Sequence, residues 1–320
     1  MPKKPQIIGL CSELLSRSNE RRSLLGSTPL FLTMQTVDHS NMYISQGTVK
    51  NLKRIQGQLN QLQPELPLKA IVVPGSPQPR ENILVFSGSF NPPTTAHLAL
   101  LRQAQQFARQ HEPMLVYAAF STHTTDKEAV ERPLLLDRIH LLQRLLHTRL
   151  PRVGIMLFNR GLYIEQAQAI HTSFPRVKRI FFLMGFDKIV QILDPRYYDD
   201  RDRVLSELFK LAVLLVAPRG NAGEQELADL LHQPENKRFA PFIQLLPFNP
   251  AYRLVSSTHV RQEDDQGTTS TLHHVPQEVR QFMRETHAYR SPVQRPDGSL
   301  VDWYGERVKY LSKLVGCPIS

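Results

Sequence analysis

The stretch VFSGSFNPPTTAHLALL, residues 85–101, contains the junction that decides the fold. An apolar run with the character of a buried strand stops at Ser-Gly-Ser (residues 87–89), passes two prolines, and resumes with the spacing of an amphipathic helix. Either Thr94 or Thr95 can cap that helix, and its free N–H groups and positive dipole end predict an anion site. His97 lies in the first turn, where protonation or a charge-assisted hydrogen bond would strengthen anion binding. A capped helix with a surface histidine is the plain alternative.

Outward from this junction, short apolar runs alternate with helical patterns. The expected strands are residues 83–88, 114–120, 153–158, 179–185, 211–218 and 242–248. The expected helices between them are residues 95–109, 134–147, 163–171, 201–210 and 224–231. Strands that are apolar nearly throughout, separated by amphipathic helices, are typical of a parallel sheet covered on both faces. We therefore predict an α/β protein with a doubly wound parallel sheet, whose ligands bind at the carboxyl ends of the strands.

The composition is that of an ordinary soluble globular protein, with 41% apolar and 21% charged residues in a chain of 320. The two cysteines, Cys11 and Cys317, cannot build a disulfide framework or a cysteine metal cage, which fits a reducing compartment. No apolar run approaches the roughly 20 residues of a membrane span, and the charged start is not followed by a signal-peptide region. We expect a cytoplasmic protein with no membrane partner, while a nuclear location stays open.

The net charge is +10, from 39 Lys and Arg against 29 Asp and Glu, and it favours anionic partners. The basic residues are spread along the chain without a run of five or six, so a nucleic-acid tail is not favoured. Residues 1–80 differ from the rest. They contain a predicted amphipathic helix, residues 48–62, followed by a Pro-rich passage, residues 62–83, that is typical of a linker or an extended strap.

A second motif, YRLVSSTHVRQ at residues 252–262, follows the last expected strand. Ser256 and Ser257 open a predicted helix directly after an extended segment, which gives another N-terminal anion site. Arg261 is four residues after Ser257 and three after Thr258, so its side chain shares a helical face with those hydroxyls. Hydroxyls, free N–H groups and a guanidinium on one face suit phosphate oxygens. A simple helix cap is the alternative.

The two motifs together resemble the signatures of the nucleotidylyltransferase superfamily. GSFNPPTTAH (residues 88–97) is similar to its phosphate-binding motif, and VSSTHVR (residues 255–261) is similar to its second signature. Three further segments resemble the nicotinamide/nicotinate mononucleotide adenylyltransferases: FFLMGFDKI (181–189), LLVAPRGN (214–221) and LHHVPQEVRQFMRETHAYR (272–290). The resemblance covers about residues 82 to 290. It implies a Rossmann-like fold and transfer of AMP from ATP to the 5′-phosphate of nicotinamide or nicotinate mononucleotide.

The resemblance also implies which residues act. His97 would contact the α-phosphate, Asp187 would hold the adenosine ribose hydroxyls, and Arg261 would hold the triphosphate tail, with His97 and Arg261 as catalytic residues. Lys127 matches a family lysine more loosely, as a phosphate contact. The full set of implied ATP contacts is Gly88, Ser89, Phe90, Thr94, His97, Gly185, Asp187, Ser257, Thr258 and Arg261.

The pyridine pocket departs from the family pattern. The family commonly stacks the pyridine ring on a tryptophan after the third strand, whereas the segment LFNRGLYIEQAQ (residues 157–168) has none. Tyr163 and Phe158 are the candidates for stacking there. Two alternatives therefore stay open: a pantetheine-phosphate adenylyl- or cytidylyltransferase, and a non-catalytic nucleotide sensor or nucleic-acid-binding protein of the same fold.

The same resemblance suggests how the chain is organised. We expect an N-terminal accessory region and linker at 1–80, a nucleotidylyltransferase domain at 81–290, and a C-terminal tail at 291–320. No cluster of His, Cys and Asp has the spacing of a protein-held metal site, so Mg²⁺ is expected to arrive with ATP. A homo-oligomer is left open.

Overall fold

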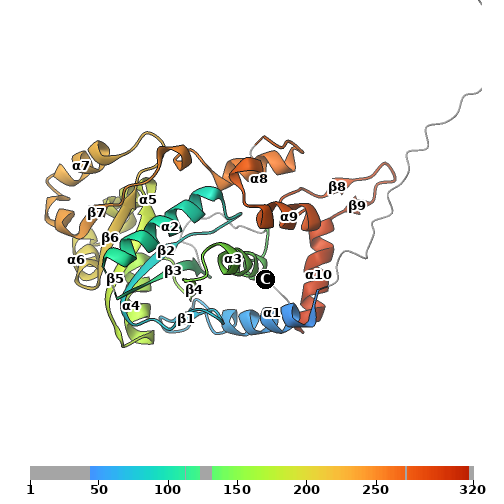
Figure 1. The fold of residues 1–320 in the computed structure, drawn as a ribbon, viewed down its shortest axis with the longest axis horizontal. Helices are drawn as coiled ribbons and strands as arrows, with labels where there is room; N and C mark the ends of the chain where they lie inside the picture. The colour runs from blue at the N-terminus through green and yellow to red at the C-terminus, as the bar shows by residue number, and fades with distance from the viewer. Residues whose placement is uncertain (1–43, 112, 123–131, 271, 317–320) are drawn as a thin grey trace, which may run out of the picture. The chain divides into compact units, whose positions relative to one another are not determined.

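A seven-stranded sheet runs through the computed structural model, which describes residues 44–111, 113–122, 132–270 and 272–316 (Figure 1). The strands are β1 (Ala70–Val72), β2 (Glu81–Ser87), β3 (Met114–Ser121), β4 (Val153–Phe158), β5 (Val177–Gly185), β6 (Ala212–Ala217) and β7 (Ile243–Leu245). They lie in the order β1-β4-β3-β2-β5-β6-β7. Every neighbouring pair is parallel except β1 and β4. The expected doubly wound α/β fold is confirmed, with a mostly parallel sheet.

Helices cover both faces of this sheet, so the strands are buried from two sides. Leu84 and Phe86 of β2 belong to the core under one helical layer, and Ile83 and Val85 belong to the core under the other. This alternation explains why the strand runs are apolar at nearly every position. The first layer contains α1 (Gln46–Leu59), α2 (Thr95–Gln110), α3 (Leu135–Arg149), α8 (Ser257–Asp265), α9 (Gln277–Thr286) and α10 (Trp303–Val315). The second contains α4 (Tyr163–Ser173), α5 (Phe186–Leu193), α6 (Arg201–Leu211) and α7 (Glu224–His232).

The Pro-rich passage expected to be a linker contains the edge strand β1. Ala70 pairs with Phe158 and Val72 with Met156, in the antiparallel direction. A strand of three residues between prolines gives no periodic pattern, which is why the sequence did not predict it. β1 therefore adds one antiparallel edge strand to the predicted parallel sheet, within a passage that was expected to be a linker or an extended strap.

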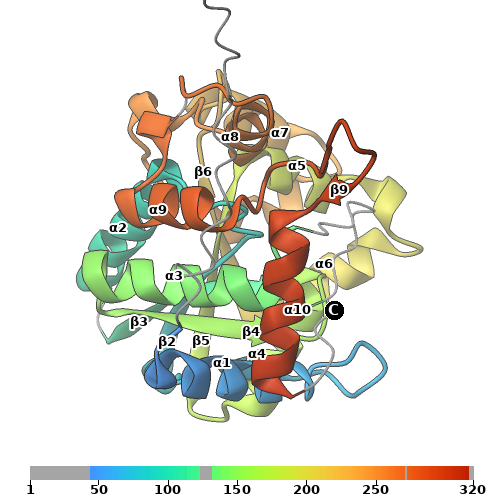
Figure 2. The ribbon, with the colours of Figure 1, turned by 90° about the vertical axis from the view of Figure 1, so that its right-hand side faces the viewer.

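The first helical layer includes segments from both ends of the described chain. α1 lies where the amphipathic helix at 48–62 was predicted, and its Leu52 and Ile55 are buried in the core. α10 crosses next to α1 and α9, and it buries Tyr304 and Leu311 (Figure 2). The described residues on both sides of positions 80 and 290 belong to one compact unit, residues 41–320. The start and end of the described chain therefore take part in the same core.

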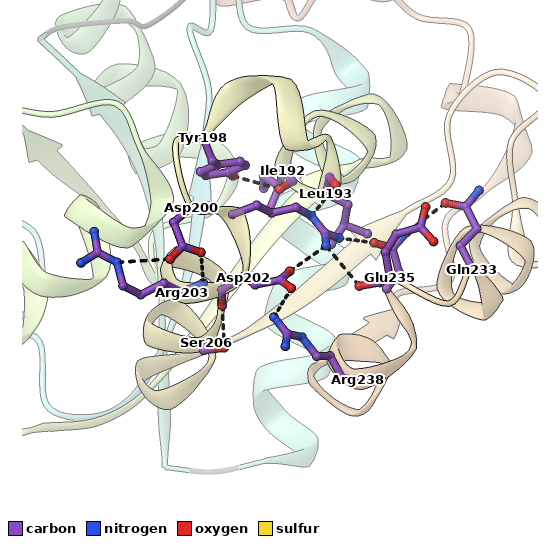
Figure 3. Close-up of polar contacts among 12 residues, drawn as sticks. Ile192, Leu193, Tyr198, Asp200, Asp202, Arg203, Ser206, Gln233, Glu235 and Arg238 are labelled. Atoms are coloured by element: carbon purple, nitrogen blue, oxygen red, sulfur yellow. Dashed lines mark hydrogen bonds and ion pairs between the residues drawn. The ribbon is translucent and has the colours of Figure 1, made fainter.

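On the second layer, Arg201 joins α6 to the end of α5 and to the segment at residues 235–236. Figure 3 shows neighbouring polar contacts of this region, among them the pair of Asp202 and Arg238. The Arg201 Nε donates to the Leu193 carbonyl at the end of α5 (2.7 Å), and its guanidinium also binds Asp202 and the Asn236 side chain. Asp202 in turn pairs with Arg238 at 2.7 Å. Since Arg201 is only 8% exposed, its charge is stabilised by these acceptors and not by water.

The strand order reverses between β2 and β5, and this reversal positions the site. The chain runs from β2 outward through β3 and β4, then returns to β5 on the other side of β2. In doubly wound sheets, ligands bind outside the carboxyl ends of the strands at such a switch point. The loop after β2 begins at Gly88, and β5 ends at Gly185, so two of the predicted motif segments lie at this point.

Candidate active site

The N-terminus of α2 is organised by Thr94 and His97. Thr94 is the N-cap, and its Oγ1 accepts a hydrogen bond from the His97 N–H at 3.4 Å. In return, the Thr94 N–H donates to His97 Nδ1 at 3.0 Å, and Thr94 Oγ1 lies 2.8 Å from the same nitrogen. This reciprocal capping fixes the imidazole in the first turn, among the free N–H groups of the helix.

The hydrogen bonds and burial of His97 make it a neutral donor. Because Nδ1 accepts from the Thr94 N–H, the proton of a neutral ring is assigned to Nε2. Burial, together with a smaller contribution from the nearby Arg219, lowers the pKa of His97 to about 4. The ring also lies 5.1 Å, between centroids, from Phe90. His97 was expected to favour an anion through protonation or through a charge-assisted hydrogen bond. The lowered pKa favours the second, a hydrogen bond from the single N–H of a neutral ring.

The loop between β2 and α2 is held close to the sheet. The Gly88 N–H donates to the Ala119 carbonyl at 3.0 Å, whereas Ser89 is exposed. Phe90 has a positive φ of 44°, and its ring is fully buried beneath His97. The ring of Phe90 is therefore part of the core beneath the loop and has no face free for a ligand. A bulky residue in this conformation is unusual and recurs at functional loops.

The start of α8 contacts this same loop. Ser257 Oγ donates to the Pro92 carbonyl at 2.9 Å, and Arg261 Nη1 donates to the Asn91 carbonyl at 2.7 Å. Arg261 Nη2 also lies 3.3 Å from Thr258 Oγ1. These bonds join residues more than 160 positions apart, with separations of 165 and 170. The two helix N-termini predicted as anion sites are therefore neighbours.

The turn after β5 adds a carboxylate and a second cation. Gly185 is the N-cap of α5, and Asp187 stands in its first turn. Asp187 Oδ2 pairs with Arg219 Nη1 at 3.0 Å, and both side chains are more than half exposed. Arg219 comes from the turn after β6, so it links the motif after β5 to the site of His97. Its position directly after a strand was the available sequence signal, although it was not singled out as a site residue.

Three sequence-predicted residues have different outcomes. Lys127 lies outside the described residues. Phe158 is 0% exposed in the core below the sheet, so its ring has no free face, and its prediction as a stacking residue is corrected. Tyr163 begins α4 and is half-buried, with its ring edge-to-face against Phe182 at 5.1 Å. It stays the candidate for stacking a pyridine ring.

Arg138 is a site residue that the sequence reasoning missed. It lies in the first turns of α3, and its Nη1 donates to the Ser89 carbonyl at 3.2 Å. Within α3 it is part of an ordinary amphipathic pattern, so only the folded chain shows its contact with the loop after β2. Arg138 and Arg261 therefore bind the loop after β2, while Arg219 lies close enough to His97 to add to the effect of burial in lowering its pKa.

Two kinds of feature are absent from the part of the chain that the structure describes. No group of three His, Cys, Asp or Glu side chains there could hold a metal ion. None of the helices there combines the length and the apolar character that crossing a membrane requires.

Comparison with known proteins gives one sequence similarity and one structural similarity. No family model matches the chain. A protein of Schizosaccharomyces pombe with the provisional name nicotinamide mononucleotide adenylyltransferase is 25% identical over 227 residues, 65% of this chain and 86% of that protein. A crystal structure from Vibrio parahaemolyticus, provisionally titled nicotinate-nucleotide adenylyltransferase, is 13% identical with a TM-score of 0.32, over 64% of this chain and 99% of that chain. The first similarity agrees with the motifs: the chain resembles the nucleotidylyltransferase superfamily and, within it, the nicotinamide/nicotinate mononucleotide adenylyltransferases.

Proposed function

We propose, with this resemblance as the premise, that the chain transfers AMP from ATP to the 5′-phosphate of nicotinamide or nicotinate mononucleotide. The observation that carries the proposal is the pair of hydrogen bonds from Ser257 to Pro92 and from Arg261 to Asn91. They bring the N-termini of α2 and α8 onto one loop at the switch point of the sheet. Two helix N-termini with a histidine and several arginines suit a triphosphate, which carries charge along its whole length.

In the proposed reaction, an oxygen of the acceptor phosphate attacks the α-phosphorus of ATP. The bond from that phosphorus to the oxygen bridging to the β-phosphate breaks, and pyrophosphate leaves with the electron pair. The acceptor phosphate is already an anion near neutral pH, so no general base is needed. The protein contributes in-line positioning and stabilisation of the charge on the phosphoryl oxygens.

Each residue has a role that follows from its chemistry. His97 donates its Nε2–H to an α-phosphoryl oxygen, and the N–H groups at the start of α2 do the same. Arg261 and the start of α8 hold the β- and γ-phosphates, which enter as the magnesium complex of ATP. Asp187 accepts from the ribose hydroxyls and is oriented by its ion pair with Arg219. Tyr163 offers a ring to the pyridine.

The direct test is an assay of the purified chain with ATP, Mg²⁺ and either nicotinamide or nicotinate mononucleotide. We expect the dinucleotide and pyrophosphate in equal amounts, and little product when CTP replaces ATP. Product with 4′-phosphopantetheine as the acceptor, and none with either pyridine mononucleotide, would contradict the acceptor proposed here. Product with CTP and none with ATP would contradict the proposed donor. Binding of ATP without any turnover would indicate a nucleotide sensor instead.

A further inference from the structure

Two arginines from different helices hold the same loop. Arg138 of α3 donates to the Ser89 carbonyl at 3.2 Å, and Arg261 of α8 donates to the Asn91 carbonyl at 2.7 Å. The two carbonyls are two residues apart on the loop that follows β2. Arg138 and Arg261 therefore bind the backbone carbonyls on either side of Phe90, and Arg261 is close enough to Arg138 to add to the effect of burial in lowering its pKa.

Within the described parts of the chain, no carboxylate balances the charges of these two arginines, because none lies within ion-pair distance of Arg138 or Arg261. Asp137, the acid next to Arg138 in sequence, is fully buried and bound by Arg307 and Tyr304. Burial lowers the pKa of Arg138, and Arg261 contributes in the same direction. Two neighbouring cations without an acid repel each other until an anion binds between them.

The hydrogen bonding around this pair is also incomplete. Arg138 Nε, Asn91 Oδ1 and Tyr289 Oη are buried and have no hydrogen-bond partner among the described residues. Tyr289 is 8% exposed and lies close enough to Arg138 and Arg261 for each to affect its ionisation. Burial nevertheless raises the pKa of Tyr289, so its hydroxyl keeps its proton. Buried polar groups in native proteins are nearly always satisfied, so several orphans in one cluster indicate a polar ligand or water that completes it.

We propose that Arg138 is a further phosphate-binding residue and that, with Arg261, it holds the terminal phosphates of the nucleotide and then the departing pyrophosphate. The identity of the anion as a nucleotide tail rests on the proposed function, whereas the paired cations rest on geometry alone. A paired guanidinium site fits pyrophosphate better than a single phosphate, because two phosphoryl groups present enough oxygens for two planar donors.

The test separates charge from structural support by using Arg138→Gln. Glutamine keeps an amide N–H donor but carries no charge, and it ends two bonds short of the position of Arg138 Nη1. The AMP affinity therefore serves as the readout that a displaced loop would change. The matched control is Arg149→Gln, at the other end of the same helix, where Arg149 pairs with Glu278 on the surface. Isothermal titration calorimetry with magnesium pyrophosphate and, separately, with AMP gives the two affinities for each protein.

We expect Arg138→Gln to weaken pyrophosphate binding about tenfold or more and to change AMP binding less than about twofold. Arg149→Gln should leave both affinities unchanged. The proposal is overturned if Arg138→Gln binds pyrophosphate as tightly as the wild type does. It is also overturned if the affinities for AMP and pyrophosphate fall equally, or if the wild-type chain does not bind pyrophosphate. Calorimetry measures binding, whereas the assay described above measures turnover, so the two results are independent. If the wild type is active in that assay and Arg138→Gln binds pyrophosphate as the wild type does, this inference alone is refuted. An inactive wild type with charge-dependent binding refutes only the proposed reaction.

Discussion

At the scale of single residues, His97 shows how a capping interaction determines chemistry. The Thr94 N–H occupies Nδ1, and burial keeps the ring neutral, so the side chain is left with one donor at Nε2. A neutral donor stabilises developing charge on a phosphoryl oxygen without competing with Arg261 for the same anion in the ground state.

The protonation state of His97 can be measured directly. Its pKa is lowered to about 4, so the charged form appears only below that pH and the neutral form prevails from about pH 5 upward. We expect ¹⁵N NMR of the imidazole to show a titration midpoint near 4, with the proton on Nε2 at pH 7. Turnover between about pH 6 and 8 should accordingly show no ionisation of this ring. A midpoint of 6 to 7 would mean that His97 is a solvated surface histidine.

At the scale of elements, α10 fastens the N-terminus of α3, from which Arg138 reaches the site. Asp137 of α3 is fully buried, and it accepts hydrogen bonds from Tyr304 at 2.9 Å and from Arg307 at 2.7 and 3.0 Å. Asp302, the N-cap of α10, pairs with Arg132 just before α3. The C-terminal helix therefore supports the loop and helix that carry part of the site.

This support predicts a large effect from one substitution. Arg307→Met leaves the buried Asp137 carboxylate without its cation, which should lower the free energy of unfolding by about 3 kcal/mol. Lys309→Met, which removes an exposed ion pair with Glu306 on the same helix, should cost less than about 1 kcal/mol. Urea denaturation of both variants measures the difference. Equal, small losses would show that the Asp137 pair contributes little.

At the scale of the whole molecule, part of the positive charge behind the net value of +10 lies beside the candidate site. Arg138, Arg219 and Arg261 come from three different segments and gather at the carboxyl edge of the sheet, close to two helix N-termini. Such a concentration of positive charge attracts nucleotides and raises their rate of encounter.

Sequence patterns predicted what local periodicity can encode. All six expected strands form, because burial on both faces makes most of their positions apolar. The edge strand β7 is the exception, since its central residue Gln244 is exposed. The short edge strand β1 lacks such a pattern. Arg138 meets a carbonyl 49 positions away, and Asp137 meets a helix about 170 positions away, so neither contact leaves a local signal. The two phosphate motifs were found because each is a local helix start, whereas their proximity is a property of the fold.

The most direct test of the central claim compares pyrophosphate release by the wild type and by His97→Ala at saturating ATP. A donor aimed at developing charge is worth about 3 kcal/mol, so we expect His97→Ala to turn over about a hundredfold more slowly while its ATP affinity falls less. His111→Ala, at the exposed far end of the same helix, should match the wild type. If His97→Ala releases pyrophosphate at the wild-type rate, the histidine only caps a helix, and the site proposed here is wrong.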